Sequence, residues 1–216
     1  MDVTLSQKIH DQIILQARLC DYTTFRLGGP CRGLLHCQTS EELELAVKFL
    51  ADSQSPFILI GGGSNLVVSD EGVDCFVIRY VADQPLLECD GNDVLVSGST
   101  SLDALALFSI EQGLAGLEYT SGIPGTVGGA IVGNAGAFGK QVGDVLKSVT
   151  LISKTGIRRK VGPEALGFTY RYSNLKERAE MVVAARFALQ PGSREKLLEE
   201  RTKILGIRHE KHPNLT

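Results

Sequence analysis

The sequence predicts an α+β fold, in which helices are interspersed with several short strands and hairpins. Three observations favour this class. Helix-capping patterns occur at Thr39 and at Thr100, short apolar runs are bounded by proline or glycine, and a turn at residues 154–156 joins two β-type segments. No internal repeat or low-complexity linker divides the chain.

Composition is that of an ordinary globular protein. Of the 216 residues, 43% are hydrophobic and 22% are charged, which argues against extensive disorder. No apolar run approaches the roughly 18 residues that a membrane-spanning helix needs, and the first 25 residues carry no apolar block typical of a signal peptide. A net charge of −3 gives no reason to expect binding to nucleic acid.

The cysteines and histidines indicate neither disulfides nor a metal site. The five cysteines are odd in number and form no C-x-x-C pair, so we expect small buried thiols in a reducing cytoplasm. His209 and His212 are three residues apart, but no third ligand lies near them in the sequence. We therefore expect no metal.

The elements of the first half follow from capping and apolar patterns. Thr39 and Glu42 form a capping box, which predicts a helix. Its buried face comprises Leu43, Ala46, Val47 and Leu50. Residues 57–60 form an apolar run between Pro56 and three glycines, which is typical of a buried strand. Further β candidates are residues 66–68, 75–78 and 94–96.

The second half begins with a helix that we expect Thr100 and Asp103 to cap and Gly113 to end. The apolar residues of this helix are Leu102, Leu105, Ala106, Phe108 and Ile110. Residues 148–153 and 157–161 form a hairpin, and residues 181–189 form a long apolar strand. Ser193 then caps a last helix. That helix carries Leu197, Leu198, Ile204 and Leu205.

Glycine is the unusual feature of the composition. There are 24 glycines, of which eight lie between residues 122 and 143 and three are consecutive at residues 61–63. Because glycine loses the most entropy on folding, such clusters indicate that the backbone passes close to something. Neither common nucleotide motif is present, since β-type residues follow Leu66 and the sequence around Lys140 does not match a P-loop.

Each glycine cluster has two interpretations. The first could be an ordinary hairpin turn, or its N–H groups could cradle a phosphate with help from Ser64 and Asn65. In the second, Gly129 and Gly133 could allow close helix packing, or the turn after Pro124 could let a flat aromatic ligand lie against the backbone. Two such clusters in one chain favour a nucleotide-containing cofactor.

Four segments carry a family resemblance. YTTFRLGGP, IGGGSNLVVSD, GLAGLEYTSGIPGTVGGAIVGNAGAFG and FTYRYSN, in this order, resemble the UDP-N-acetylenolpyruvoylglucosamine reductase (MurB) family from about Tyr22 onward. The resemblance implies an FAD-binding domain of the vanillyl-alcohol-oxidase/PCMH type with two α+β subdomains. It also implies NADPH-dependent reduction of a UDP-sugar enolpyruvyl ether to UDP-N-acetylmuramate for peptidoglycan synthesis, and hence a part in cell-wall biogenesis, cell shape and cell division.

Carried over position by position, the resemblance implies two groups of FAD-binding residues. The pyrophosphate group comprises Ile60, Gly61, Gly62, Gly63, Ser64, Asn65 and Leu66. The remaining flavin contacts comprise Ser121, Gly122, Ile123, Pro124, Gly125, Thr126, Gly128, Gly129, Asn134 and Ala135. The chain departs from the family at Phe138, where tyrosine is usual, and at residues 131–133, which often carry Met.

Four further residues resemble the family's substrate-handling positions. Arg171 corresponds to the arginine that holds the enolpyruvyl carboxylate, where a fixed guanidinium stabilises developing negative charge. Tyr170, Arg208 and Lys211 correspond to substrate contacts. Residues 176–211 contain nine Lys and Arg against six Asp and Glu, a balance that suits anionic ligands and equally suits a solvated helix face.

The resemblance divides the chain into subdomains at residues 1–80 and 81–191 and a helical segment at 192–216. In the family, a third domain follows the segment KHPNLT and holds the serine that protonates the substrate and an assisting glutamate. No residue of this sequence is assigned either role, so we expect flavin binding from this chain and leave its turnover open. Apolar surface left by that missing domain predicts self-association.

Three functions therefore compete. The first is the reductase, and the second is a flavin-binding module without reductase activity. A third is another flavin oxidase of the same fold; covalent attachment of flavin uses His or Cys, but nothing marks His36 or Cys31 for that purpose.

Overall fold

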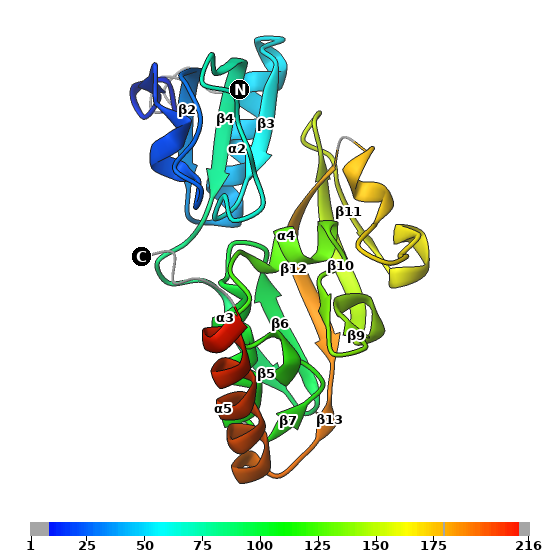
Figure 1. The fold of residues 1–216 in the computed structure, drawn as a ribbon. Coiled ribbons are helices and arrows are strands. Elements are labelled where there is room, and N and C mark those ends of the chain that lie inside the picture. Colours follow the sequence, from blue (N-terminus) through cyan, green and yellow to red (C-terminus); the bar gives the residue numbers. More distant parts are fainter. Residues whose placement is uncertain (1–8, 179, 212–216) are drawn as a thin grey trace.

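The computed structural model describes residues 9–178 and 180–211, which form two β-sheets with helices packed against them (Figure 1). His212, considered from the sequence as a metal ligand, lies outside the described residues, as do residues 1–8. The helices are α2 (Ser40–Asp52), α3 (Leu102–Glu111), α4 (Val127–Val132) and α5 (Arg194–Lys211). Short 3₁₀ turns are η1 (Leu19–Tyr22), η2 (Glu118–Thr120), η3 (Val142–Asp144), η4 (Pro163–Leu166) and η5 (Asn174–Lys176).

The first sheet has the order β1-β2-β4-β3. Its strands are β1 (Ile14–Leu15), β2 (Cys31–Cys37), β3 (Phe57–Ile60) and β4 (Val73–Tyr80). β2, β4 and β3 run parallel, so their carboxyl ends meet at one edge. Parallel sheets commonly bind ligands at this edge.

The second sheet is antiparallel, with the order β11-β10-β12-β6-β5. Its strands are β5 (Leu87–Asp90), β6 (Asp93–Ser97), β10 (Leu146–Ser153), β11 (Arg158–Val161) and β12 (Glu180–Ala188). Two small ladders join β7 (Leu114–Ala115) to β13 (Gln190–Pro191) and β8 (Gly136–Ala137) to β9 (Lys140–Gln141). α3 and α4 pack on this sheet through a shared core, and α5 runs alongside α3 (Figure 1).

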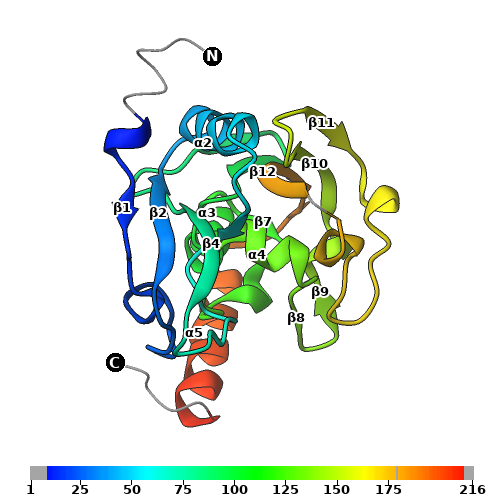
Figure 2. The same ribbon diagram turned by 90° about the horizontal axis from the view of Figure 1, so that it is seen from above.

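Helix α2 connects the two halves. The Thr39–Glu42 capping box is present, and the four residues predicted for its buried face are all buried. One hydrophobic cluster contains residues of α2, of the first sheet, and Ile152, Met181 and Val183 of the second. Viewed from above, α2 lies between β2 and β12 (Figure 2). The prediction of an α+β fold is confirmed.

Most predicted elements are present, including the hairpin β10–β11 and the last helix. The strand predicted at residues 66–68 is wrong: these residues lie in the connection between β3 and β4, and the side chain of Val67 is 77% exposed. The cap of α3 is Ser101 rather than Thr100, because the Ser101 hydroxyl accepts the Ala104 N–H while that of Thr100 faces Ser97. An apolar run without a pairing partner does not make a strand.

The cysteine prediction is confirmed in part. All five thiols are free, but only Cys31 and Cys37 are buried, while Cys89 is exposed. Burial raises the pKa of Cys37 to about 12, so this thiol stays protonated at neutral pH. Among the described residues there is no group of three or more metal-type side chains placed to hold an ion. None of their helices has the length and apolar content to cross a membrane.

Candidate functional site

The glycine triplet lies where the parallel strands of the first sheet end. Gly61 follows directly on β3, and Ile60 is the register partner of Arg79 on β4. Because β3 and β4 are parallel, the segment between them is a crossover, so the interpretation as an ordinary hairpin turn is wrong.

Other backbone or side-chain atoms lie close to the position that a Cβ would occupy at each glycine of the triplet. A Cβ added at Gly61 would clash with the Thr126 hydroxyl, and one at Gly62 would lie 3.7 Å from the Cα of Gly125. Gly63 has a φ of +67° and faces the carbonyl of Tyr22. The two glycine clusters, far apart in the sequence, therefore meet at residues 61–62 and 125–126.

The second glycine cluster begins α4, which Thr126 caps by accepting the Gly129 N–H at 3.3 Å. The N–H of Gly128 donates to the carbonyl of Gly98, and that of Val127 donates to Thr100. These amides are therefore bonded to the protein itself. Gly128 shapes the site by letting the chains approach, since a Cβ at Gly128 would lie 3.1 Å from the Gly98 oxygen.

Ser121 lies in the loop between η2 and α4 and is fully buried, yet its Oγ has no hydrogen-bond partner. Its backbone is satisfied, since its N–H donates to Glu118 and its carbonyl accepts from Arg208. The Tyr119 hydroxyl is also buried without a partner, and burial raises its pKa above the usual range. Buried polar groups are normally paired, so such an orphan indicates a missing ligand.

Asn134 is held entirely by the protein. This residue is 1% exposed, and its side-chain amide donates to Gln141 Oε1 at 2.8 Å and to the Thr169 carbonyl at 2.9 Å. Its Oδ1 accepts the Gly143 N–H at 3.0 Å. The neighbouring Ala135 N–H donates to Ala130. The Asn134 side chain thus joins the end of α4 to the segment that carries Tyr170 and Arg171.

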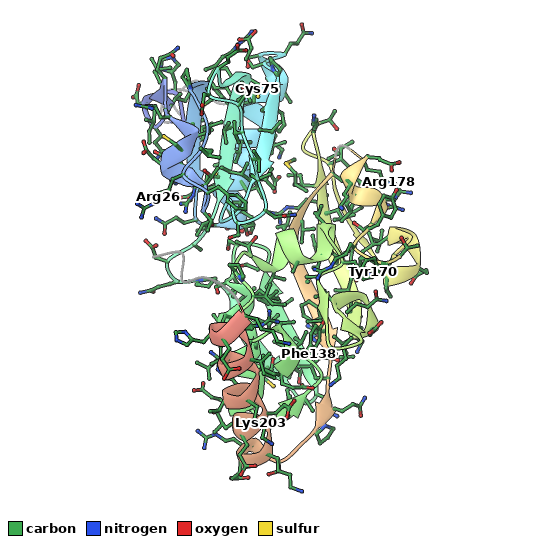
Figure 3. The ribbon with its side chains drawn as sticks, in the orientation of Figure 1. Arg26, Cys75, Phe138, Tyr170, Arg178 and Lys203 are labelled. Carbon is green, nitrogen blue, oxygen red and sulfur yellow. The ribbon has the colours of Figure 1, made fainter. Side chains whose placement is uncertain are left out.

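Tyr170 and Arg171 form the tip of a tight turn closed by mutual hydrogen bonds between Thr169 and Tyr172. Arg171 has a φ of +57°, and Tyr170 is 87% exposed. Figure 3 shows Tyr170 at the outer side of the second sheet. Ser173, next in the chain, is fully buried and donates to the Val132 carbonyl at 2.8 Å.

Arg208 contacts the Ser121 loop directly. Its Nε donates to the Ser121 carbonyl at 2.8 Å, its Nη2 donates to the Tyr119 carbonyl at 3.1 Å, and its guanidinium lies 5.9 Å from the centroid of the Phe138 ring. Burial, and after it the positive charge of Arg171, lowers the pKa of Arg208. The positive charges of two arginines, Arg208 from α5 and Arg171 from the 169–172 turn, are therefore near enough to influence each other. Lys211 is exposed on the last turn of α5.

Three charged residues were not assigned to the site from the sequence, although Asp103 was expected as a cap of α3. Asp103 accepts the Gly122 N–H at 2.7 Å and pairs with both terminal nitrogens of Arg201. Arg79 lies with its guanidinium 5.8 Å from the ring centroid of Tyr22, and its Nε is buried without a partner. No motif marks these residues as part of a site, because their partners there are distant in the sequence.

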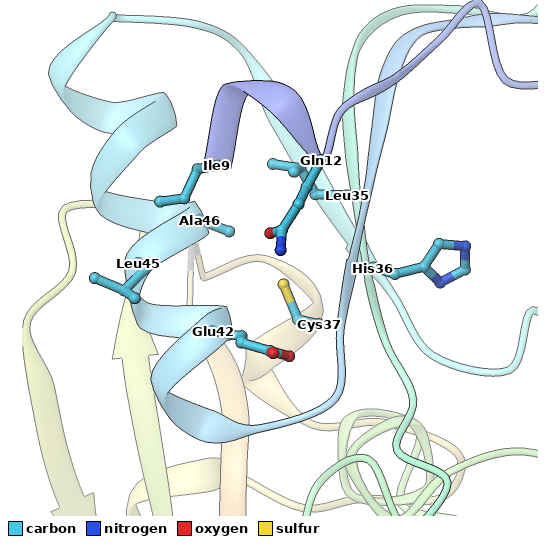
Figure 4. Close-up of a pocket in the computed structure, with 8 residues that line it drawn as sticks. All are labelled: Ile9, Gln12, Leu35, His36, Cys37, Glu42, Leu45 and Ala46. Carbon is cyan, nitrogen blue, oxygen red and sulfur yellow. The ribbon is translucent and has the colours of Figure 1, made fainter. Parts of the chain in front are cut away.

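A small cavity lies away from these loops. It has a volume of about 150 Å³ and lies between α2 and β2, where Gln12, Cys37 and Glu42 point toward it and His36 points away (Figure 4). Its thiol is the protonated Cys37, so it offers no reactive nucleophile. The predicted site is instead the place where the loops at residues 61–62 and 125–126 meet.

Comparison with known proteins gives a consistent result. Residues 31–162 match the model of an FAD binding domain. The UDP-N-acetylenolpyruvoylglucosamine reductase of Carboxydothermus hydrogenoformans is 37% identical over 91% of this chain and 65% of its own length. That of Syntrophus aciditrophicus is 35% identical over 97% of this chain and 68% of its own length. The chain therefore spans about two thirds of these relatives.

Solved structures agree. The crystal structure of UDP-N-acetylenolpyruvylglucosamine reductase (MurB) from Thermus caldophilus superposes with a TM-score of 0.79 at 33% identity, over 94% of this chain and 71% of that one. 6-Hydroxy-D-nicotine oxidase from Arthrobacter nicotinovorans superposes with a TM-score of 0.62 at 16% identity, over 83% of this chain and 42% of that one, which shows a shared fold alone. The predicted vanillyl-alcohol-oxidase/PCMH type of fold is confirmed.

Proposed function

Because this chain belongs to the UDP-N-acetylenolpyruvoylglucosamine reductase family, we propose that it binds FAD and takes part in the NADPH-dependent reduction of a UDP-sugar enolpyruvyl ether to UDP-N-acetylmuramate. The reaction would belong to peptidoglycan synthesis in the cytoplasm. We further propose that residues 1–80 and 81–191 act as the two flavin-binding subdomains.

The orphaned hydroxyl of Ser121 carries the FAD proposal. A buried hydroxyl without a partner costs about 1–3 kcal/mol, and a bound flavin would supply the missing hydrogen bond. The neighbouring glycines remove the side chains that would keep a flat ring or a diphosphate away from the backbone. The residues present therefore fit the cofactor that the family implies.

Each part of the site has a role in this proposal. Residues 60–66 would hold the pyrophosphate through backbone N–H groups and the side chains of Ser64 and Asn65. Residues 121–126 would line the flavin ring, with Ser121 donating its hydroxyl proton. FAD, when bound, would carry two electrons from NADPH to the enolpyruvyl double bond.

Arg171 would hold the enolpyruvyl carboxylate. As electrons reach the double bond, negative charge develops toward that carboxylate, and a guanidinium fixed by its turn stabilises the charge without reorganising. The mutual repulsion of Arg171 and Arg208 suits an anionic ligand. Since Arg208 already bonds two carbonyls, we propose that its contact with substrate is electrostatic and that Tyr170 and the exposed Lys211 reach the substrate directly. We assign no residue of this sequence to protonation of the substrate, and propose that the chain corresponds to the flavin-binding part of its relatives.

An anaerobic titration tests the proposal. Purified protein receives FAD, then NADPH, then the enolpyruvyl sugar nucleotide, and the flavin absorption is recorded at each step. We expect bound flavin, bleaching by NADPH, and a spectral change on adding substrate that Arg171→Ala abolishes while FAD binding is kept. Bleaching without any response to substrate would favour a flavin-binding module, and absence of flavin binding would contradict the whole proposal.

A further inference from the structure

The peptide that carries Ser121 is held from both sides by charged side chains. On one side, Arg208 of α5 donates to the carbonyls of Tyr119 and Ser121 at 3.1 and 2.8 Å. On the other, the carboxylate of Asp103 on α3 accepts the Gly122 N–H at 2.7 Å. Charge-assisted bonds of this kind are roughly twice as strong as neutral ones.

Asp103 is itself fixed by α5. The two terminal nitrogens of Arg201 donate to its two carboxylate oxygens at 2.7 and 2.9 Å, a bidentate arrangement that sets the orientation of both groups. The side chain of Arg201 is 13% exposed. The hydrogen bond from Arg201 holds the pKa of Asp103 below its usual range, so the carboxylate remains ionised at neutral pH.

Helix α5 is also seated directly on the loop. Gly122 has a φ of +74°, and a Cβ there would lie 2.8 Å from Leu205 and 3.1 Å from Arg208. Any other residue at position 122 would therefore be strained, and the Leu205 and Arg208 side chains would have to shift to make room for it. The helix and the loop form one packed unit.

Among the Ser121 carbonyl, the Gly122 N–H and the Ser121 hydroxyl, these contacts leave one group without a protein partner. The Ser121 carbonyl and the Gly122 N–H are both bonded to charged groups, whereas Ser121 Oγ is not bonded. We infer that α5 is a working part of the flavin site, in which Asp103 and Arg201 are positioning residues that hold the Ser121 hydroxyl ready for the cofactor. This inference rests on the proposed binding of FAD.

The test compares Arg201→Gln with Arg159→Gln. Arg159 forms an equally bidentate pair with Glu180 at 2.5 and 2.6 Å, but it lies on β11, away from the Ser121 loop, and serves as a matched control. We measure the dissociation constant of FAD, the absorption spectrum of the flavin at saturation, and amide hydrogen exchange at Gly122 in the cofactor-free protein.

We expect Arg201→Gln to weaken FAD binding about tenfold, to shift the flavin spectrum at saturation, and to speed Gly122 exchange. Arg159→Gln should change the FAD dissociation constant by less than about twofold. Arg201→Lys, which keeps the positive charge but cannot form the bidentate pair with Asp103, should recover part of the affinity for FAD.

Equal FAD affinity and an unchanged flavin spectrum in Arg201→Gln would overturn the inference. If the wild-type chain itself binds no FAD, the proposed function fails, and the flavin role of α5 fails with it. Gly122 exchange still decides separately whether Asp103 and Arg201 hold the loop: an exchange rate unchanged by Arg201→Gln would show that they do not.

Discussion

Ser121 shows how a single residue can indicate a ligand. Its hydroxyl has lost contact with water and gained no partner, although hydroxyl groups elsewhere in the interior, such as those of Ser109 and Ser173, donate to carbonyls. A folded protein seldom keeps such a group without a reason, because the desolvation cost is not recovered.

Ser121→Ala should therefore act in opposite directions on the two states of the protein. Without cofactor, the free energy of unfolding should stay equal or rise by up to about 1 kcal/mol, since an unsatisfied hydroxyl is removed. FAD affinity should fall about tenfold because the proposed hydrogen bond from the Ser121 hydroxyl to the flavin is lost. Denaturant unfolding and FAD titration measure the two effects. Ser109→Ala, which removes an equally buried hydroxyl in α3, is the control that should leave FAD affinity intact.

Asp103 gives the loop a dependence on pH. The pKa of its carboxyl is lower in the folded protein than in the unfolded chain, so its contribution to stability is fully present above the ordinary value of about 4. That contribution is lost as the pH falls through the depressed folded-state pKa. The difference in free energy of unfolding between wild type and Asp103→Asn should thus narrow on acidification below pH of about 4. Urea titrations across this range would contradict the assignment if the difference stayed constant.

At the scale of elements, the end of α4 controls the turn that presents Arg171. Asn134 bonds the carbonyl of Thr169 before the turn, and the Val132 carbonyl accepts from Ser173 after it. Lys176 also donates to the carbonyl of Arg171 at 2.8 Å. A turn whose tip has a positive φ needs such support, because that conformation is unfavourable for arginine.

Asn134→Ala should loosen this turn. The Thr169 carbonyl and the Gly143 N–H would both lose buried partners, at a cost of about 2–3 kcal/mol in unfolding free energy. Trypsin should then cut after the exposed Arg171 about tenfold faster than in wild type. The matched control is Asn174→Ala in the adjacent 3₁₀ turn η5, which removes one hydrogen bond from the side-chain amide to the Ala165 carbonyl. Cleavage at Arg171 that is equally fast in both variants would show that Asn134 has no special hold on the turn.

Predictions of elements were right where a local sequence signal is sufficient, and they were wrong where the pairing of strands decides the structure. The capping box of α2 and the turn at residues 154–156 act within a few residues, and both are present. Residues 66–68 have the composition of a strand, but no neighbouring strand pairs with them. The parallel arrangement of β3 and β4, which excludes a hairpin, likewise depends on contacts that the sequence does not display.

At the scale of the whole molecule, the loops at the edge of the first sheet carry exposed apolar side chains. The segment with Phe25 and Leu27 lies beside the one with Leu66 and Val67, since Thr24 donates to Gly63 and Gly29 donates to Ser69. The side chains of Phe25, Leu27 and Val67 are 50%, 46% and 77% exposed. Exposed apolar patches favour association.

We expect the protein to self-associate through this edge. Sedimentation velocity should show a weight-average mass that rises with concentration, and Val67→Ser should reduce the rise. Ile157→Ser removes an apolar side chain of comparable exposure, 68%, from the β10–β11 hairpin of the second sheet and should not reduce the rise. A concentration-independent monomer would contradict the expectation, and an equal effect of the two variants would place the interface elsewhere.

The sequence by itself determined the fold class and the two glycine clusters, because capping, apolar periodicity and backbone freedom are local properties of the chain, and the resemblance of four motifs indicated the family. Tertiary structure decided what individual polar side chains do. The resemblance assigns Asn134 and Arg208 to ligand contacts, yet the side chains of both already donate hydrogen bonds to backbone carbonyls more than 30 residues away. The Asp103–Arg201 pair spans 98 positions and was invisible before folding. Hydrogen-bond partners depend on which surfaces pack together, and only the folded chain sets that.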